Sequence, residues 1–220
     1  MSGLATAQPA RRAVKELEQA ATNEAQQRDE TAKRAFANTQ IKTADGKCLF
    51  VDKLSGDFRA NLTPVQIATC GTTDGQGWDV ITSGKHNDQQ GRIAIVSTLT
   101  QACLNVDPRR KEGDRVNLFS CGGRADGGGE VTDSQLFRFD GGNGPLSLVP
   151  GNSSGQCLSS KGHRVDVASC VDGAEDQSFS FGGDQRNGNG NGNGNGNGNG
   201  TDDAGSGNRD GCNNRSTRMV

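Results

Sequence analysis

Apolar and polar positions alternate with a period of two between residues 40 and 183. The alternation is clear at Ile93 and Ile95, and the short stretches end at turn-forming pairs such as Asp45-Gly46. Short strands, frequent turns and no helical interludes predict an all-β domain. We expect twelve strands in three groups of four, at residues 41–43, 48–52, 65–70 and 78–82, then 95–99, 103–107, 116–121 and 136–140, then 146–149, 156–160, 165–170 and 178–182.

The three groups repeat one phrase. Each copy of the phrase begins at a cysteine, which is Cys48, Cys103 or Cys157, and these cysteines are 55 and then 54 residues apart. The phrase continues through a strand that starts with valine and reaches a second cysteine. Each closes with a Gln-x-aromatic triplet, and these triplets are Gln76-Gly77-Trp78, Gln135-Leu136-Phe137 and Gln177-Ser178-Phe179. An internal repeat indicates a small unit that buries a shared core only when stacked. Three units of four strands predict a β-trefoil.

Residues 10–37 follow a different pattern. Ala, Glu, Gln, Lys and Arg dominate, and the apolar positions keep a spacing near 3.6 residues, at Val14, Leu17, Ala21, Ala32 and Phe36. We therefore expect a helical or linker segment over residues 1–39. One interpretation is a solvated helix that packs loosely beside the domain or is partly disordered. The other is a helical stalk or a remnant of a neighbouring domain.

Three further segments have little apolar character. Residues 184–220 contain seven consecutive Asn-Gly pairs, between positions 187 and 200, and predict a disordered low-complexity tail. Residues 83–92 and 122–133 are Gly-rich and polar, and predict surface insertions between the repeat units. The cluster Lys85-His86-Asn87-Asp88 is expected to be a solvated loop tip.

Composition excludes several partners. The formal net charge is −2, and no Lys/Arg cluster is flanked by aromatic residues, so nucleic acid is not expected as a partner. No apolar stretch approaches the roughly 18–20 residues of a membrane span. Residues 1–12 also lack the apolar centre of a signal peptide.

Six of the seven cysteines form pairs within the repeats, 22, 18 and 13 residues apart. Zinc sites favour cysteines two to four residues apart, with histidine, and neither His86 nor His163 has such neighbours. We therefore expect no metal. We expect three disulfides and an oxidising compartment, extracellular space or the cell wall; the disulfides are Cys48–Cys70, Cys103–Cys121 and Cys157–Cys170.

Two features bear on export. Cys212 is left over, as a free or intermolecular thiol, and four sequons (Asn61, Asn152, Asn199 and Asn214) are usable on a secretory route. The missing leader conflicts with the disulfides. A truncated gene model or an unconventional export route would reconcile the two, and both remain open.

The series of Cys-Leu-x-Val-Asp, Val-led strand and Gln-x-Trp/Phe resembles the ricin B-chain-like lectins, a β-trefoil family of carbohydrate-binding domains, over residues 40–183. The first two repeats also look like a group of secreted fungal proteins that carry this domain. The resemblance implies that Trp78, Phe137 and Phe179 fill the barrel centre. It also implies that the paired glutamines, Gln76 and Gln177 among them, bond the backbone around the turn.

In that family, sugar is bound by a carboxylate two residues after the first cysteine. An aromatic ring two residues before the second cysteine and an Asn-Gln step before the last aromatic complete the site. The first repeat has Phe50, Ala68 and Gly75 at these positions and looks inactive. The third keeps only scattered polarity, at Ser159 and Asp176.

The second repeat matches better, because it has both a ring and an amide. Asn105 replaces the acid, and Asp107 could supply a carboxylate from one pleat further along. The resemblance implies a carbohydrate-binding set of Asn105, Asp107, Asn117, Phe119, Ser134 and Gln135. The alternative is structural: Phe119 covers a disulfide, Asn105 caps a turn and Asp107 starts one.

No catalytic motif appears, and Asp52 and Asp107 lie a full repeat apart, too far in sequence to suggest a glycosidase pair. We expect no enzyme activity and no cofactor. Two functions remain. One is a non-catalytic glycan-binding module with one weak site in the second repeat. The other is a sugar-inactive trefoil that serves as a structural or protein-interaction domain of the cell wall or extracellular space.

Overall fold

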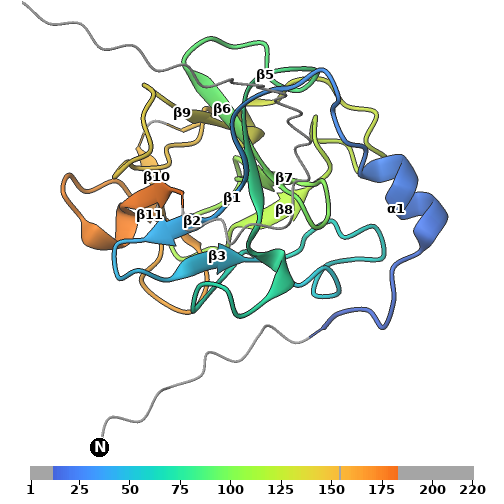
Figure 1. The fold of residues 1–220 in the computed structure, drawn as a ribbon, viewed down its shortest axis with the longest axis horizontal. Helices are drawn as coiled ribbons and strands as arrows, with labels where there is room; N and C mark the ends of the chain where they lie inside the picture. The colour runs from blue at the N-terminus through green and yellow to red at the C-terminus, as the bar shows by residue number, and fades with distance from the viewer. Residues whose placement is uncertain (1–11, 154, 183–220) are drawn as a thin grey trace, which may run out of the picture. The chain divides into compact units, whose positions relative to one another are not determined.

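The computed structural model describes residues 12–153 and 155–182, so the predicted tail and Cys212 lie outside the described residues. One short helix and twelve strands make up the fold (Figure 1). In chain order they are α1 (Gln19–Ala25), β1 (Lys33–Thr39), β2 (Ile41–Thr43), β3 (Cys48–Phe50), β4 (Gln66–Ala68), β5 (Trp78–Ser83), β6 (Arg92–Ser97), β7 (Cys103–Asn105), β8 (Asn117–Phe119), β9 (Leu136–Arg138), β10 (Gln156–Ser159), β11 (Asp166–Ser169) and β12 (Phe179–Phe181).

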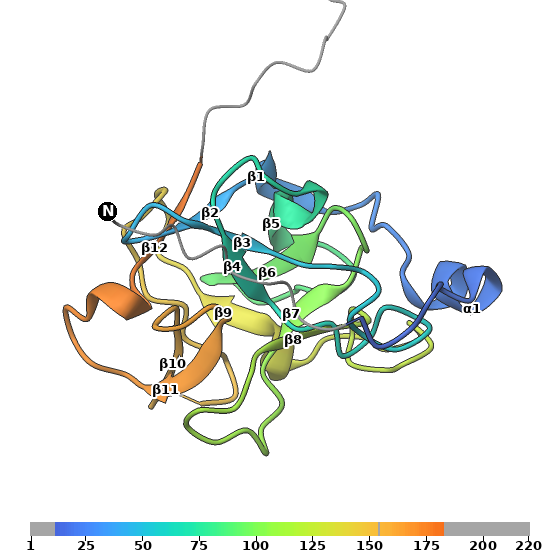
Figure 2. The same ribbon diagram turned by 90° about the horizontal axis from the view of Figure 1, so that it is seen from below.

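The strands form a β-trefoil. Each repeat contributes one antiparallel hairpin: β3–β4, β7–β8 or β10–β11. Other antiparallel pairs join outer strands, within the second repeat (β6–β9) or across repeat boundaries (β5–β6 and β12–β2). Figure 2 shows the three hairpins from below. They are joined by three isolated bridges, one for each pair of repeats, which are Pro64 with Asn117, Gln66 with Arg164 and Arg115 with Asp166. The predicted fold class is confirmed.

Eleven of the twelve predicted strands form, with shifted ends. Residues 146–149 make only isolated bridges, of Leu146 with Phe179 and, just beyond, of Pro150 with Phe137. Pro145 and Pro150 flank this stretch and have no N–H to donate, so a regular ladder cannot extend through either end.

The core has the threefold character that the repeat implies. Trp78 and Phe137 are fully buried and Phe179 is 1% exposed, and all three belong to the main hydrophobic cluster. The indole nitrogen of Trp78 donates to the Leu49 carbonyl at 3.1 Å, so the buried polar edge of the ring is satisfied. The structure thus places the three aromatic residues of the Gln-x-aromatic triplets in the core.

The prediction of a helix over residues 10–37 is wrong in its extent. The helix covers only Gln19–Ala25, and Lys33–Thr39 forms β1, antiparallel to β5. Asp79 on β5 is buried and accepts from Arg34 Nε at 2.7 Å and from the Asn38 N–H at 2.8 Å. These tertiary bonds outweigh the helix propensity of Ala, Lys and Arg, which is a weak preference.

The expectation of a loosely packed, solvated segment is also wrong. The ring of Phe36 packs against that of Phe181, with centroids 5.3 Å apart. Gln26 is 8% exposed, and its Nε2 donates to Asn61 Oδ1 at 3.1 Å and to Ser120 Oγ at 3.2 Å. Residues 12–39 therefore pack directly against all three repeats, through Asn61 of the first, Ser120 of the second and Phe181 of the third.

Two expectations about polar surface residues need correction. Asn87 is 1% exposed, because its Nδ2 bonds the Ile81 and Arg92 carbonyls, and the neighbouring His86 bonds the Glu130 carbonyl at 2.8 Å. His86 and Asn87 are therefore anchored, whereas Lys85 and Asp88 are exposed, as expected for a loop tip. Asn61 is fully buried, so its sequon is not accessible in the folded chain.

The three predicted disulfides are confirmed, with S–S distances of 2.08, 2.02 and 2.06 Å. In the described part of the chain, no group of three or more His, Cys, Asp and Glu side chains could hold a metal ion. Over the same residues, no helix has the length and apolar character needed to cross a membrane.

Candidate functional site

The β7–β8 hairpin positions most of the predicted sugar-binding residues. Its register places Asn105 opposite Asn117 and Cys103 opposite Phe119. Side chains at paired and alternate positions of a hairpin share one face, so Asn105, Asn117 and Phe119 lie together. Phe119 and Asn105 are partly exposed, whereas Asn117 is 3% exposed. The ring and one amide are therefore accessible to a ligand, and the second amide is not.

Ser134 reaches this face from the short 3-10 helix η2 (Asp133–Gln135). Its Oγ donates to Asn105 Oδ1 at 3.0 Å, and the Thr132 hydroxyl lies 3.0 Å from the same Oγ. The Ser134 carbonyl accepts from the Val106 N–H at 2.8 Å, which fixes η2 against the end of β7. The result is a row of hydroxyl and amide groups beside Phe119.

Asp107 lies two residues beyond Asn105, in a turn. Its carboxylate is bound by Arg109, with Nε–Oδ1 at 2.8 Å and Nη2–Oδ2 at 2.6 Å. These hydrogen bonds from Arg109 lower the pKa of Asp107 to about 2. The carboxylate is therefore ionised at neutral pH, and a sugar hydroxyl must share it with a guanidinium.

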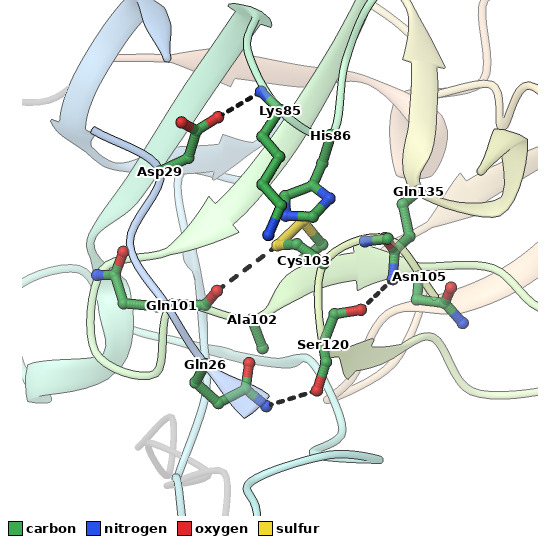
Figure 3. The surroundings of a disulfide bond; sticks show 12 residues. Gln26, Asp29, Lys85, His86, Gln101, Ala102, Cys103, Asn105, Ser120 and Gln135 are labelled. Carbon is green, nitrogen blue, oxygen red and sulfur yellow. Dashed lines mark hydrogen bonds between the residues drawn. A yellow bond between two sulfur atoms is a disulfide. The ribbon is translucent and has the colours of Figure 1, made fainter. Parts of the chain in front are cut away.

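Gln135 is part of the structural framework. It is 2% exposed, its Nε2 donates to the Ser120 carbonyl at 3.0 Å, and its Oε1 accepts from the Gly122 N–H at 2.8 Å. Figure 3 shows this side chain directed at Ser120, beside the Cys103–Cys121 disulfide. Both polar atoms are thus used by the backbone on either side of Cys121.

The other two glutamines do the same. Gln76 bonds the Thr69 carbonyl at 2.9 Å and the Gly71 N–H at 2.6 Å. Gln177 bonds the Ser169 carbonyl at 2.8 Å and the Val171 N–H at 2.9 Å. The repeat already carried this signal, because Gln135 occupies the same position as its two equivalents. The structure does not bring it to the face of Asn105 and Phe119.

The third repeat holds a contact that the sequence did not reveal. Ser159 Oγ donates to Asp176 Oδ2 at 2.6 Å, between the positions equivalent to Asn105 and Ser134. A hydroxyl and a carboxylate are therefore joined where the second repeat joins an amide and a hydroxyl. The ring is missing, because Ala168 stands at the position of Phe119.

The first repeat differs from both. Phe50 is 6% exposed and Ala68 replaces the ring. These two residues and Gly75 line an open hollow of about 440 Å³, which Arg12 and Asp52 also border as an ion pair at 3.1 Å. The first repeat thus has neither a ring at the position of Phe119 nor an amide or carboxylate at that of Asn105.

A second hollow, of about 530 Å³, adjoins the second-repeat face at Ser134. Its remaining lining comes from the two insertions, from Pro108 and from Asn152. None of these insertion residues was singled out from the sequence as part of a site, since each insertion was interpreted as an isolated surface loop. Only their proximity in the fold brings them together.

The structure resembles several solved proteins, at identities that support the fold alone. The designed threefold-symmetric protein ThreeFoil matches with a TM-score of 0.51 and 21% identity, covering 66% of this chain and 97% of the other. An exo-β-1,3-galactanase from Clostridium thermocellum matches with a TM-score of 0.50 and 18% identity, covering 66% and 30%. A mosquitocidal holotoxin matches with a TM-score of 0.51 and 14% identity, covering 68% and 17%.

No protein of curated function matches the chain. The family model of the ricin-type β-trefoil lectin domain matches residues 37–179, and again residues 91–206. The first match spans well over half of the chain, and it contains the three disulfides, the three glutamine–backbone contacts and the buried aromatic residues described above. The chain therefore belongs to the ricin-type β-trefoil lectin family.

Proposed function

We propose that this protein is a non-catalytic carbohydrate-binding module with one weak site, in the second repeat. The site consists of Phe119, Asn105 and Ser134, with Asp107 at its edge. The observation that carries the proposal is the hydrogen bond from Ser134 to Asn105, on the same hairpin face as the partly exposed ring of Phe119.

The chemistry of these groups suits a sugar. The C–H face of a pyranose packs on an aromatic ring, and its vicinal hydroxyls pair with amide, hydroxyl and carboxylate groups. One ring and a few hydroxyl contacts give a dissociation constant roughly in the millimolar to micromolar range. Glycans or polysaccharides are therefore the proposed partners.

The location follows from the covalent structure. Three disulfides are typical of proteins that fold in oxidising compartments, which supports extracellular space or a cell wall. The similarity to the galactanase covers only 30% of that enzyme. We infer binding from the lectin fold of this chain and assign it no hydrolytic step.

The alternative function is a sugar-inactive trefoil that acts as a structural or protein-interaction domain. Two observations favour it: Asn117 is buried, and the Asp107 carboxylate is already occupied by Arg109. On this alternative, the folded and oxidised protein binds no glycan.

A glycan array probed with the full oxidised chain separates the two, followed by titration of the best-bound glycan. We expect Phe119→Ala to weaken binding about tenfold or more, since loss of a stacked ring removes over about 1.4 kcal/mol. Phe58→Ala is the matched control, because Phe58 is 43% exposed and stacks on Arg59, outside the second-repeat hairpin. Absence of any glycan binding, or full binding by folded Phe119→Ala, would exclude the proposed site.

A further inference from the structure

We propose that the two insertions build an additional saccharide subsite next to the second-repeat site. With it, the module binds oligosaccharides of neutral or amino sugars and rejects uronates. The inference rests on the proposed function, because the subsite extends a site at Phe119 and Asn105. Its evidence is separate, and comes from the hollow that borders Ser134.

The hollow and the proposed second-repeat site have Ser134 in common. Ser134 lines the hollow and also donates to Asn105, so one hydroxyl belongs to both places. Pro108 follows Asp107 and lines the same space. A cavity volume of about 530 Å³ falls within the range of about 300–1,000 Å³ that is typical of small-molecule sites. A second sugar unit linked to one at Phe119 therefore has room beside it.

The walls of the hollow are held in place by bonds between the insertions. Gln89 of the first insertion donates from Nε2 to Asp133 Oδ1 of the second, at 2.8 Å. His86 Nδ1 bonds the Glu130 carbonyl at 2.8 Å, as a second link between the same loops. The base of the first insertion is fixed by the buried Asn87. Binding here would cost little loop ordering, which favours affinity.

The lining offers mainly acceptors. The carboxylates of Asp88 and Asp133 border the hollow, and no Lys or Arg of the described residues lines it. Asn152 is held at the edge of the hollow, because its Nδ2 donates to the Val106 carbonyl at 2.8 Å. Pro108 and Val131 add apolar surface for a sugar's C–H face.

This arrangement selects by charge. Sugar hydroxyls and ammonium groups donate to carboxylates, and a protonated amino sugar gains a charge-assisted bond. A uronate would place a third carboxylate beside Asp88 and Asp133, and like charges brought together at a binding surface weaken the complex. Neutral oligosaccharides should therefore bind, glucosamine oligomers more tightly, and oligogalacturonate not at all.

The test uses the full oxidised chain and calorimetric titration. The probes are the monomers and trimers of galactose, N-acetylglucosamine and glucosamine, together with trigalacturonate. We expect at least one neutral trimer to bind about tenfold more tightly than its monomer. The glucosamine trimer should bind more tightly than the N-acetylglucosamine trimer. Trigalacturonate should show no binding. The double variant Asp88→Asn/Asp133→Asn should remove the preference for the glucosamine trimer.

Asp126→Asn is the matched control, because Asp126 lies in the second insertion, pairs with Arg124 and does not line the hollow. Two results would overturn the subsite and leave the proposed function intact, provided that monomer binding depends on Phe119. One is that no trimer binds more tightly than its monomer. The other is that trigalacturonate binds as tightly as the neutral trimers. Trimer binding that depends on Asp88 and Asp133 but not on Phe119 supports the subsite and overturns the second-repeat site. No binding of any probe overturns both.

Discussion

Asp107, at the edge of the proposed site, has a carboxylate that is already paired with Arg109. Arg109 lowers its pKa from 3.8 to about 2. The stabilisation from the Asp107–Arg109 pair is therefore fully present above pH 3.8 and is lost as the pH falls through about 2. We expect the charge of Asp107, and its contribution to glycan binding, to stay constant from pH 7 to pH 5.

Arg109→Ala should raise the Asp107 pKa toward 3.8, measured by NMR titration of the carboxyl carbon. Arg138→Ala is the control, since Arg138 and Asp140 form an exposed pair at 3.6 Å. A titration midpoint near 4 for Asp107 in the unaltered protein would contradict the pairing.

Gln135 shows what the sequence could and could not determine about single residues. Alternation along the hairpin correctly placed Asn105, Asn117 and Phe119 on one face, because register follows from the repeat. It could not show that both polar atoms of Gln135 are consumed by backbone, or that Asn117 is covered. Those facts depend on the packing of η2 and of residue 64 from the first repeat.

Gln135→Ala should therefore lower stability, in the same way as Gln76→Ala and Gln177→Ala. Each substitution leaves a backbone donor and acceptor unpaired, at a cost of about 1–3 kcal/mol in the free energy of unfolding. Urea denaturation measures it, with the exposed Gln90→Ala as control. A Gln135 variant of unchanged stability that loses only glycan binding would restore Gln135 to the site.

At the scale of elements, each of the three hairpins carries one disulfide, and the three disulfides differ in how exposed their cysteines are. Cys170 is exposed and Cys70 is partly exposed, whereas Cys103 and Cys121 are 1% and 8% exposed. The second disulfide is covered because the insertions and residues 25–29 pack over it, as Figure 3 shows at Gln26, Asp29 and His86. Thiol exchange requires access to a sulfur atom, so exposure should set the order of reduction.

We expect a small thiol under native conditions to reduce Cys157–Cys170 first and Cys103–Cys121 last. Alkylation of samples taken over time, followed by peptide mass spectrometry, gives the order. The same reaction in denaturant is the control, since unfolding should remove the difference. Early loss of Cys103–Cys121 in the native protein would show that residues 25–29 do not cover it in solution.

The strand β1 illustrates why some elements were missed. Its sequence, Lys33–Thr39, has the Ala and Lys/Arg content of a helix, and only the partner strand reveals the alternative. The repeat predicted strands wherever another copy provided the same pattern, but β1 has no counterpart in the second or third repeat. Local propensity was the sole guide there, and tertiary pairing outweighed it.

On the scale of the whole molecule, residues 12–39 complete the lectin domain through Asp79. The Asp79 side chain is 4% exposed and pairs with Arg34 at 2.7 Å and, more distantly, with Arg28 at 3.7 Å. A carboxylate buried to this degree is tolerated only when it is paired and hydrogen-bonded. The unit that folds should therefore begin before residue 40.

Arg34→Ala should lower the free energy of unfolding by about 3 kcal/mol, because it leaves the buried Asp79 carboxylate with only the Asn38 N–H and the distant Arg28 as partners. Adding Asp79→Asn should recover part of the loss, since a neutral amide costs less to bury unpaired. Arg12→Ala is the control: Arg12 is 66% exposed, and its ion pair with Asp52 should contribute less than about 1 kcal/mol. Chemical denaturation of the four proteins forms a test of the N-terminal segment. If Arg34→Ala lowers the free energy of unfolding no more than Arg12→Ala does, then β1 is dispensable and residues 40–183 form the complete module. If Arg34→Ala lowers it by several times more, a fragment of residues 40–183 is a destabilised domain. Glycan binding measured on that fragment would then report on its instability rather than on the site at Phe119.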